Sequence, residues 1–326
     1  MQPPVQSAQM QSTELTPLIR PRELILELSH NCNLSCIMCG FVKERNQPGY
    51  FMTEATLNQV LAAFPHPPEV VRLNGRGEST IHPQFPAFLK AIRDKWPAAA
   101  LHLFTNLNIR DIERVELLKV AGVQLFISLD SSDSVELSQI RRGARWEYME
   151  RNLNLLRDQQ PRPFIVFTIQ AENLHRITDI ARLAQSYKFG LIYNVVRSDL
   201  PDHRVLNRVI TEWATIRKAF IAAKSLLDAA GLPCLIPDQI QGIELDLHTA
   251  VKSNGSRSAC PALHRETCIQ YDGFVTPCNM FHPRKLGHIR DGNIVQILNS
   301  GPAEAFRQSH KQDSYCRNCA WLGGDA

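Results

Sequence analysis

Six short apolar runs alternate along the chain with segments of helical period, and this alternation limits the possible folds more than any other feature. The runs are residues 24–28, 70–73, 101–104, 123–129, 164–169 and 191–196. Strands that are apolar on both faces and separated by helices predict a parallel sheet covered by helices. Six such units are fewer than a closed eight-unit barrel needs. We therefore predict an α/β fold with a partial (β/α)6 barrel, whose chemistry lies at the carboxyl ends of the strands.

The segments between these runs carry apolar residues at every third or fourth position, as amphipathic helices do. Thr53 is placed to cap a helix that presents Leu57 and Val60 on one face. The third helix is expected to begin at Asp111 and to end before Gly122.

The chain has 326 residues, enough for one large domain with a smaller appendage. Its net charge of +4 is small and scattered, which argues against nucleic acid or a membrane surface as a partner. Residues 1–22 are rich in Gln, Pro, Ser and Thr and lack the apolar core of a signal peptide, so we expect a flexible tail and a cytoplasmic protein. Disulfides are rare in the cytosol, so the nine cysteines point to metal binding.

Three cysteines follow the first predicted strand with the spacing CxxxCxxC: Cys32, Cys36 and Cys39. Three thiolates on one tight loop can hold three irons of a four-iron cluster, and the fourth iron then keeps an open position for a ligand. The competing readings are a zinc knuckle that lacks its fourth ligand, or three unrelated buried thiols. The position of the loop, where barrel geometry places an active site, favours the cluster.

This cysteine triplet after the first strand of a six-unit partial barrel resembles the signature of the radical S-adenosylmethionine (SAM) superfamily. After the second strand, residues 74–78 resemble the family's Gly-Gly-Glu motif, although Arg76 separates the two glycines. The resemblance implies that Gly75, Gly77 and Glu78 bind SAM, with the carboxylate of Glu78 holding its amino group. Glycines let a backbone approach a ligand closely, and a carboxylate matches an ammonium group.

The resemblance extends to the ends of the later strands. Asn106 lies in a Thr-Asn pair like the family's Thr-Asn-Gly, and Ser128 and Asp130 end the fourth strand. In the family, a Ser at this strand end and an Arg in the loop that follows contact the ribose and the carboxylate of SAM. An Arg fork suits a carboxylate, but the sequence leaves the choice between Arg141 and Arg142 open. Three residues at the last two strand ends are further candidates for cofactor or substrate contacts: Gln170, Asn194 and Arg197.

The C-terminal part has turns and short strands, and it carries a second cysteine set: Cys260, Cys278, Cys316 and Cys319. Residues 269–276 predict a hairpin with Asp-Gly in the turn. This pattern resembles the twitch domain, the short form of the SPASM auxiliary-cluster domain. We therefore expect one auxiliary four-iron cluster, with a four-cysteine zinc site as the alternative. The expected domains are a tail (1–22), a radical SAM barrel (23–235) and a small α+β auxiliary domain (236–326).

The family resemblance implies that the first cluster, reduced by one electron, cleaves SAM to methionine and a 5′-deoxyadenosyl radical. The radical then removes a hydrogen atom from an unactivated C–H bond of the substrate. The auxiliary cysteine pattern is similar to that of a cyclitol dehydrogenase of aminoglycoside biosynthesis. It therefore implies oxidation of a small polar metabolite, such as a sugar or a cyclitol, through the auxiliary cluster. A low-potential electron donor of the flavodoxin or ferredoxin type is the implied partner.

Three alternatives stay open at the level of sequence. An epimerase would return a hydrogen atom from a thiol, for which Cys268 is the candidate, although a lone cysteine is more often a packed core residue. A peptide substrate would make the chain an enzyme that modifies ribosomal peptides. A non-catalytic iron–sulfur or zinc scaffold would use the first motif for structure alone, but it would not need the glycine–carboxylate loop at residues 74–78.

Overall fold

The computed structural model describes residues 18–44, 46–196, 206–237, 239–240, 243–244, 252–253, 260, 262–278, 282–317 and 319. Within these residues one ten-stranded sheet forms the centre of the molecule, and a small second sheet lies apart from it. The six predicted strands are all present, with ends within two residues of the expected ones. They are β1 (Glu23–Leu26), β2 (Val70–Arg72), β3 (Ala100–Thr105), β4 (Gln124–Ser128), β5 (Phe164–Ile169) and β6 (Gly190–Val195).

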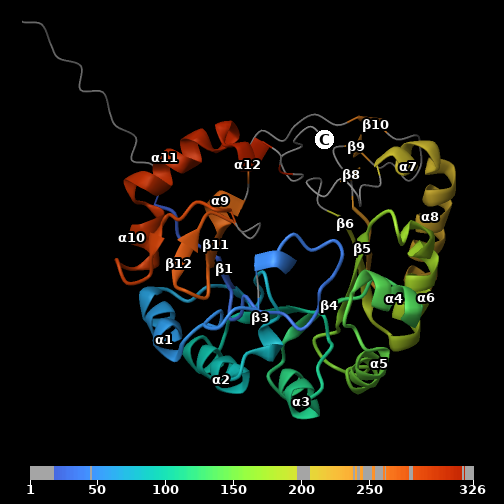
Figure 1. Ribbon diagram of the computed structural model, residues 1–326, viewed down its shortest axis with the longest axis horizontal. Helices are drawn as coiled ribbons and strands as arrows, with labels where there is room; N and C mark the ends of the chain where they lie inside the picture. The colour runs from blue at the N-terminus through green and yellow to red at the C-terminus, as the bar shows by residue number, and fades with distance from the viewer. Residues whose placement is uncertain are drawn as a thin grey trace, which may run out of the picture.

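These six strands are parallel neighbours in chain order, and they curve into an open crescent with the helices on its outer side (Figure 1). The partial barrel is therefore confirmed. The covering helices are α1 (Glu54–Ala63), α2 (Phe85–Lys95), α3 (Ile112–Val120), α4 (Ser134–Ile140), α5 (Trp146–Leu155), α6 (Ile177–Tyr187), α7 (Leu206–Thr211) and α8 (Trp213–Ala229). The predicted cap at Thr53 is present, because its side chain accepts the N–H of Thr56 at 3.1 Å. Asp111, where the third helix was expected to begin, caps α3 by accepting the N–H of Glu113 at 3.0 Å.

Alternate residues of each strand face the helices, as the period of a strand requires. On β1 these are Leu24 and Leu26, which belong to the same apolar core as the helix residues. The other face of each strand lines the inside of the crescent, called here the lumen. By this alternation the lumen side of β1 carries Glu23, Ile25 and, just past the strand, Glu27.

The lumen is filled in layers from the amino to the carboxyl ends of the strands, as in closed barrels. Arg72 closes the amino end through ion pairs with Glu23 and, at 3.9 Å, with Glu266. Above it, the rings of Phe104 and Phe126 stack with centroids 4.5 Å apart. The layer at the carboxyl ends is polar, which places the hydrogen-bonding groups of the interior at the rim where the chemistry was expected.

The sheet continues beyond both ends of the predicted barrel. On one side, β7 (Cys234–Leu235) pairs in parallel with β6 and was not predicted. On the other side, β11 (Glu266–Ile269) pairs in parallel with β1, with Cys268 opposite Ile25. The strands β12 (Phe274–Thr276) and β13 (Gly287–His288) then follow in antiparallel order. The auxiliary region therefore extends the barrel sheet from the β1 edge.

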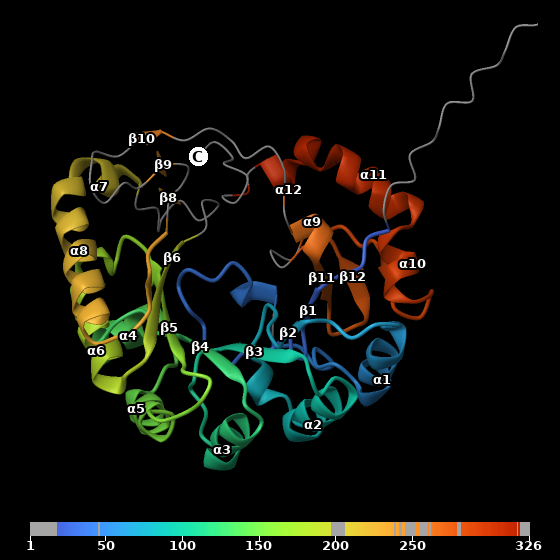
Figure 2. The same ribbon diagram turned by 180° about the vertical axis from the view of Figure 1, so that it is seen from behind.

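The predicted hairpin is β11–β12, but its turn differs from the expected one. The N–H of Gly273 donates to Gln270 O at 2.9 Å, so Tyr271 and Asp272 are the central residues and Gly273 follows them with a φ of +86°. Helices α10 (Ile294–Leu298) and α11 (Gly301–Ser309) pack outside this hairpin at one end of the crescent, and α7 and α8 lie at the other end (Figure 2). The remaining elements are the strands β8 (Gln239–Ile240), β9 (Ile243–Glu244) and β10 (Lys252–Ser253), the helices α9 (Ala262–Arg265), α10 (Ile294–Leu298), α11 (Gly301–Ser309) and α12 (Ser314–Arg317), and four 3-10 turns, η1 (Val42–Glu44), η2 (Ser79–Ile81), η3 (Leu174–Arg176) and η5 (His310–Gln312).

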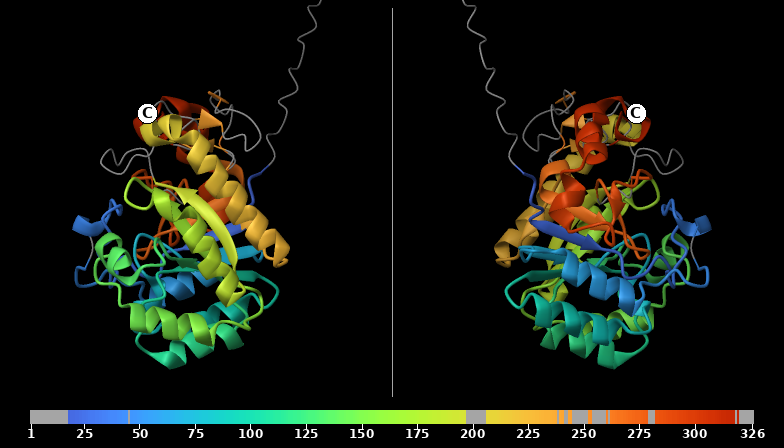
Figure 3. Two further views of the ribbon diagram at one scale, coloured as in Figure 1. Left: turned by 90° about the vertical axis from the view of Figure 1, so that its right-hand side faces the viewer. Right: turned by 90° about the vertical axis from the view of Figure 1, so that its left-hand side faces the viewer.

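Side views show α8 running slantwise along the outside of the molecule, where it packs next to α6 (Figure 3). No helix in the described part of the chain combines the length and the apolar character that a membrane span requires.

Candidate active site

The first cysteine loop, residues 32–39, lies at the carboxyl-end rim directly after β1, as predicted. Backbone hydrogen bonds fix it to the segment that ends α4. The N–H of Ser35 donates to Arg142 O at 2.8 Å, and that of Ile37 donates to Ile140 O at 2.9 Å. The loop is therefore held between the ends of β1 and α4, and its three cysteines are not joined in disulfides: Cys32, Cys36 and Cys39.

Two side chains, one just after a strand and one just after a helix, point at these thiols. The amide nitrogen of Asn106, after β3, lies 3.7 Å from the sulfur of Cys32. The guanidinium of Arg141, after α4, lies 3.9 Å from the sulfur of Cys36. Donors directed at sulfur favour the thiolate form and tune a cluster that thiolates hold.

Arg141 is the inward-pointing member of the arginine pair that the sequence could not resolve. Its side chain is buried and forms an ion pair with Asp130 at 2.7 Å, whereas Arg142 is exposed. Asp130 is completely buried at the end of β4 and also accepts the N–H of Thr168 at 2.8 Å. Burial raises the pKa of Asp130, and Arg141 opposes this shift. The two residues form one buried unit beside Cys36.

The loop at residues 74–78 packs against the end of β1, and this packing requires both of its glycines. A Cβ on Gly75 would lie 2.3 Å from Cγ of Glu27, and one on Gly77 would lie 2.2 Å from the carbonyl oxygen of Asn31. The sequence explained these glycines by the approach of a ligand. The structure adds a second reason, which is that side chains here would collide with the segment that leads into the first cysteine loop.

Glu78 is buried, and its carboxylate has four donors within the protein. Oε1 accepts from Thr80 N, from Thr80 Oγ1 at 2.7 Å and from Thr105 Oγ1 at 2.9 Å, and Oε2 accepts from Asn106 N at 2.8 Å. Burial raises the pKa of Glu78, and these hydrogen bonds oppose the shift. In the structure this carboxylate ties the loop after β2 to the end of β3. A contact with the amino group of SAM stays a prediction, and Oε2 is the oxygen with capacity left for it.

The remaining predicted residues lie at successive strand ends of the lumen. Ser128 is half-buried on the lumen face of β4, and Asn194 is exposed near the end of β6. Gln170 is completely buried after β5, and neither atom of its carboxamide has a hydrogen-bond partner among the described residues. Arg197 lies outside the described residues.

The second set of cysteines converges on one small, largely apolar pocket, although its members are spread over the C-terminal part of the chain. Leu263, Pro277 and Phe306 contribute to its lining. All four predicted ligands line this pocket: Cys260, Cys278, Cys316 and Cys319. Burial raises the pKa of Cys316 to about 12, and the other three thiols and Asp313 act in the same direction. Thiolates at this place therefore need the positive charge of a metal centre.

Comparisons with known proteins identify the two parts of this site. Residues 26–184 match the family model of the Radical SAM superfamily, and residues 260–320 match that of an iron-sulfur cluster-binding domain, SPASM. The chain therefore carries a radical SAM domain followed by a SPASM domain. Its SPASM domain places it in the branch that carries auxiliary clusters. The cofactors of this radical SAM protein are therefore SAM and [4Fe–4S] clusters.

Solved structures with a similar fold include proteins that bind S-adenosylmethionine (AdoMet). The anSMEcpe structure with bound AdoMet has a TM-score of 0.69 and 16% identity, over 94% of this chain and 84% of that one. Streptococcus suis SuiB bound to S-adenosylmethionine has a TM-score of 0.67 and 17% identity, over 93% of this chain and 72% of that one. BtrN in complex with AdoMet and 2-DOIA has a TM-score of 0.51 and 15% identity, over 92% of this chain and 93% of that one. No curated protein sequence matches this radical SAM chain.

The donor sets of this radical SAM protein fit iron–sulfur clusters better than single zinc ions. Zinc holds thiolates at about 2.3 Å in a tetrahedron, which puts the sulfurs about 3.8 Å apart. In the described residues, the one group of three ligand atoms within 4.8 Å of one another is His282, Asp313 and Cys316. No three cysteine sulfurs there meet that spacing. Wider spacing suits a cluster, because several irons lie between the thiolates.

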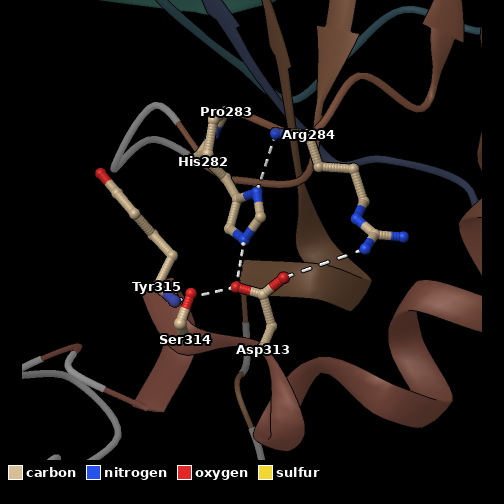
Figure 4. Close-up of a pocket in the computed structure, with 6 residues that line it drawn as sticks. All are labelled: His282, Pro283, Arg284, Asp313, Ser314 and Tyr315. Atoms are coloured by element: carbon tan, nitrogen blue, oxygen red, sulfur yellow. Dashed lines mark hydrogen bonds and ion pairs between the residues drawn. The ribbon is translucent and has the colours of Figure 1, made fainter.

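A histidine that the sequence did not single out supports the auxiliary site. His282 is buried, and its Nε2 lies 3.0 Å from Oδ1 of Asp313 (Figure 4). Its Nδ1 accepts the N–H of Arg284 at 3.0 Å, so Nε2 carries the proton and donates to the carboxylate. Asp313 in turn accepts the N–H of Tyr315 at 2.9 Å and thus caps α12, which carries Cys316. No local pattern reveals this contact, because the two partners are 31 residues apart.

Proposed function

We propose that this radical SAM protein is an oxidoreductase that dehydrogenates its substrate and uses the C-terminal cysteines as an electron-transfer site. One observation carries the proposal: all four C-terminal cysteines line one pocket. That pocket belongs to a region whose strand β11 pairs directly with β1, the strand that leads into the first cysteine loop. A cluster with four thiolate ligands has no open iron for a substrate, so electron transfer is its natural role.

When bound, the clusters and SAM supply one-electron chemistry, in which reductive cleavage of SAM gives methionine and a radical that takes a hydrogen atom from the substrate. For an alcohol, loss of a hydrogen atom, then of one proton and one electron, leaves a carbonyl group. The electron that started the cycle is returned, so SAM and the alcohol give methionine, 5′-deoxyadenosine, the carbonyl compound and one proton. An external donor of the flavodoxin or ferredoxin type is the proposed source of the first electron.

The proposed roles follow the geometry of the rim. Cys32, Cys36 and Cys39 hold the SAM-binding cluster, and Arg141 binds the carboxylate of SAM from its place beside Cys36. Asp130 orients Arg141 through their buried ion pair. Further cofactor contacts are proposed for the loop and strand-end residues Gly75, Gly77, Glu78, Asn106, Ser128 and Asn194.

Complete burial of Cys268 favours oxidation over the epimerase alternative. By strand alternation this thiol faces the lumen, and burial raises its pKa, so it stays protonated as a hydrogen donor must. It is completely buried in β11, between β1 and β12, which leaves a substrate no access to it. We therefore propose a packing role for Cys268.

For the substrate, we propose a small polar metabolite such as a sugar or a cyclitol. The resemblance of the auxiliary cysteine pattern to that of a cyclitol dehydrogenase supports it. A peptide is the second candidate. SuiB bound to precursor peptide SuiA and anSMEcpe with the Cp18Cys peptide, at TM-scores of 0.61 and 0.63, are closer in fold than BtrN with 2-DOIA. We propose that the protein works in the reducing cytosol, which keeps its cysteines available as ligands. This location is compatible with either substrate.

Iron and acid-labile sulfide content after anaerobic reconstitution tests the proposal. We expect about eight irons per chain, and about four in a variant with Cys32, Cys36 and Cys39 changed to Ala. A Cys316→Ala, Cys319→Ala variant should lose the auxiliary cluster but still form 5′-deoxyadenosine from SAM under strong reduction. About four irons in the wild type and none in the first variant would leave the C-terminal cysteines to zinc and would end the dehydrogenase proposal.

A further inference from the structure

The carboxylate of Glu27 lies where the barrel, the loop at residues 74–78 and the auxiliary hairpin meet. Glu27 follows β1 on its lumen side, and its side chain is completely buried. Its Oε1 accepts the backbone N–H of Arg76, in the loop after β2, at 2.8 Å. Its Oε2 accepts the backbone N–H of Tyr271, in the β11–β12 turn, at 3.4 Å. These donors lie 49 and 244 residues from Glu27 along the chain.

The surroundings of Glu27 hold its carboxylate in one place. Nδ1 of His30 lies 3.3 Å from Oε1, and among the described residues no lysine or arginine forms an ion pair with this carboxylate. The rings of His30, Tyr50 and Tyr271 pack against one another. Their centroids are 5.0 Å apart for His30 and Tyr50, 5.2 Å for Tyr50 and Tyr271, and 5.6 Å for His30 and Tyr271. Below it, the missing side chain of Gly75 makes room for the Glu27 methylenes. A buried carboxylate with backbone donors on both oxygens is costly to disturb.

We propose that Glu27 is a positioning residue that couples the loop at residues 74–78 to the auxiliary hairpin. Each oxygen of one rigid, buried group holds one of the two segments, so a shift of either segment pulls on the other. Because Arg76 and Tyr271 contribute backbone N–H groups, the coupling acts on the main chain and sets the relative position of the two cofactor-binding parts.

The test uses the anaerobically reconstituted full chain and compares Glu27→Gln with Glu23→Gln. Both glutamates lie on the lumen side of β1 and both variants lose one charge, but Glu23 pairs with Arg72 at the opposite end of the strand. Gln at position 27 turns one N–H donor toward a backbone N–H, so one of the two hydrogen bonds is lost. Hydrogen–deuterium exchange is read on peptides that cover residues 74–78 and 270–273.

We expect exchange in both segments to be about tenfold faster in Glu27→Gln and unchanged in Glu23→Gln. Faster exchange in one segment alone would overturn the coupling. Equal acceleration throughout the chain in both variants would show a general loss of stability and would also overturn it.

A second pair of variants changes the hairpin at Tyr271 and leaves Glu27 intact. Tyr271→Pro removes the N–H at a turn position that suits proline, and Tyr271→Ala removes the ring but keeps the N–H. We expect Tyr271→Pro, relative to Tyr271→Ala, to speed exchange at residues 74–78 across the interface. No difference between them in that loop would contradict the proposal.

Equilibrium dialysis with SAM adds a readout that rests on the proposed SAM-binding role of this loop. We expect about tenfold weaker binding in Glu27→Gln and no change in Glu23→Gln. Coupled exchange with unchanged SAM affinity would keep the positioning role and refute the binding role of the loop. The two failures are therefore distinguishable.

Discussion

At the scale of single residues, Gln170 is a group that the folded chain does not satisfy. It lies after β5 in the polar layer of the lumen, completely buried, and both its carboxamide oxygen and nitrogen lack partners among the described residues. A buried polar group without a partner costs about 1–3 kcal/mol. Such a cost is expected where a bound molecule supplies the missing hydrogen bonds, and we therefore propose Gln170 as a binding residue that lowers the stability of the protein.

Gln170→Leu should therefore stabilise the reconstituted protein in the absence of SAM and substrate, by about 1–3 kcal/mol. Thermal denaturation monitored by circular dichroism measures this, with Asn152→Leu as the matched control. Asn152 is equally buried, but its amide nitrogen donates to Leu107 O at 3.1 Å and to Ile109 O at 2.8 Å. We expect the control to be destabilised. Destabilisation by both variants would show that the chain itself satisfies Gln170.

The residue scale also shows where sequence reasoning stops. The position of Cys32, Cys36 and Cys39 follows from a local pattern, because spacing and the preceding strand are both readable in the sequence. The choice between Arg141 and Arg142 cannot be read from the sequence, because it depends on how the chain turns after α4. The four donors to Glu78 come from two separate loops, so only the fold reveals that its carboxylate is already engaged.

At the scale of elements, His82 connects three of them: η2, α1 and α2. It ends the 3-10 turn η2, its Nε2 donates to Met52 O just before α1 at 2.8 Å, and its Nδ1 accepts the N–H of Gln84 at the start of α2 at 3.0 Å. Burial lowers the pKa of His82 below its ordinary value of 6.5, and Arg114 acts in the same direction. A protonated ring would direct N–H against N–H at Gln84.

The sign of the pH effect follows from this shift. Below the ordinary pKa of 6.5 the unfolded chain binds a proton at His82 that the folded chain does not, so stability falls as pH falls through this range. His82→Gln removes this contribution. From about pH 7.5 to about pH 5.5, the wild type should lose up to about 1.4 kcal/mol more than the variant. Urea denaturation at both pH values measures the difference, and parallel losses in the two proteins would refute it.

The strands β7 and β11 show why elements were missed while six others were predicted. The six predicted strands carry runs of apolar residues because both of their faces are buried. β7 has two residues, Cys234 and Leu235, which is too short for any period to appear. β11 was expected within a hairpin, but its parallel pairing with β1 joins segments from opposite ends of the chain, and nothing local encodes such a contact.

At the scale of the whole molecule, the sheet is continuous from β13 to β7, and the β1–β11 pairing joins the predicted barrel to the predicted auxiliary domain. Four residue pairs form this junction, from Glu23 opposite Glu266 to Leu26 opposite Ile269. Within the sheet, β1 has neighbours on both sides. Without β11 it would become an edge strand, and its apolar Leu24–Leu26 stretch would offer unpaired backbone groups to other molecules.

A chain that lacks residues 260–326 should therefore aggregate, although it keeps all three cysteines of the first loop. Light scattering after size-exclusion chromatography measures this under anaerobic conditions. The matched control is the full chain with the four auxiliary cysteines changed to Ala, which loses the metal ligands but keeps β11. We expect the control to stay monodisperse, because strand pairing, rather than the cluster, covers the β1 edge. A monodisperse truncated chain that binds about four irons would instead show that the barrel folds alone as an independent unit.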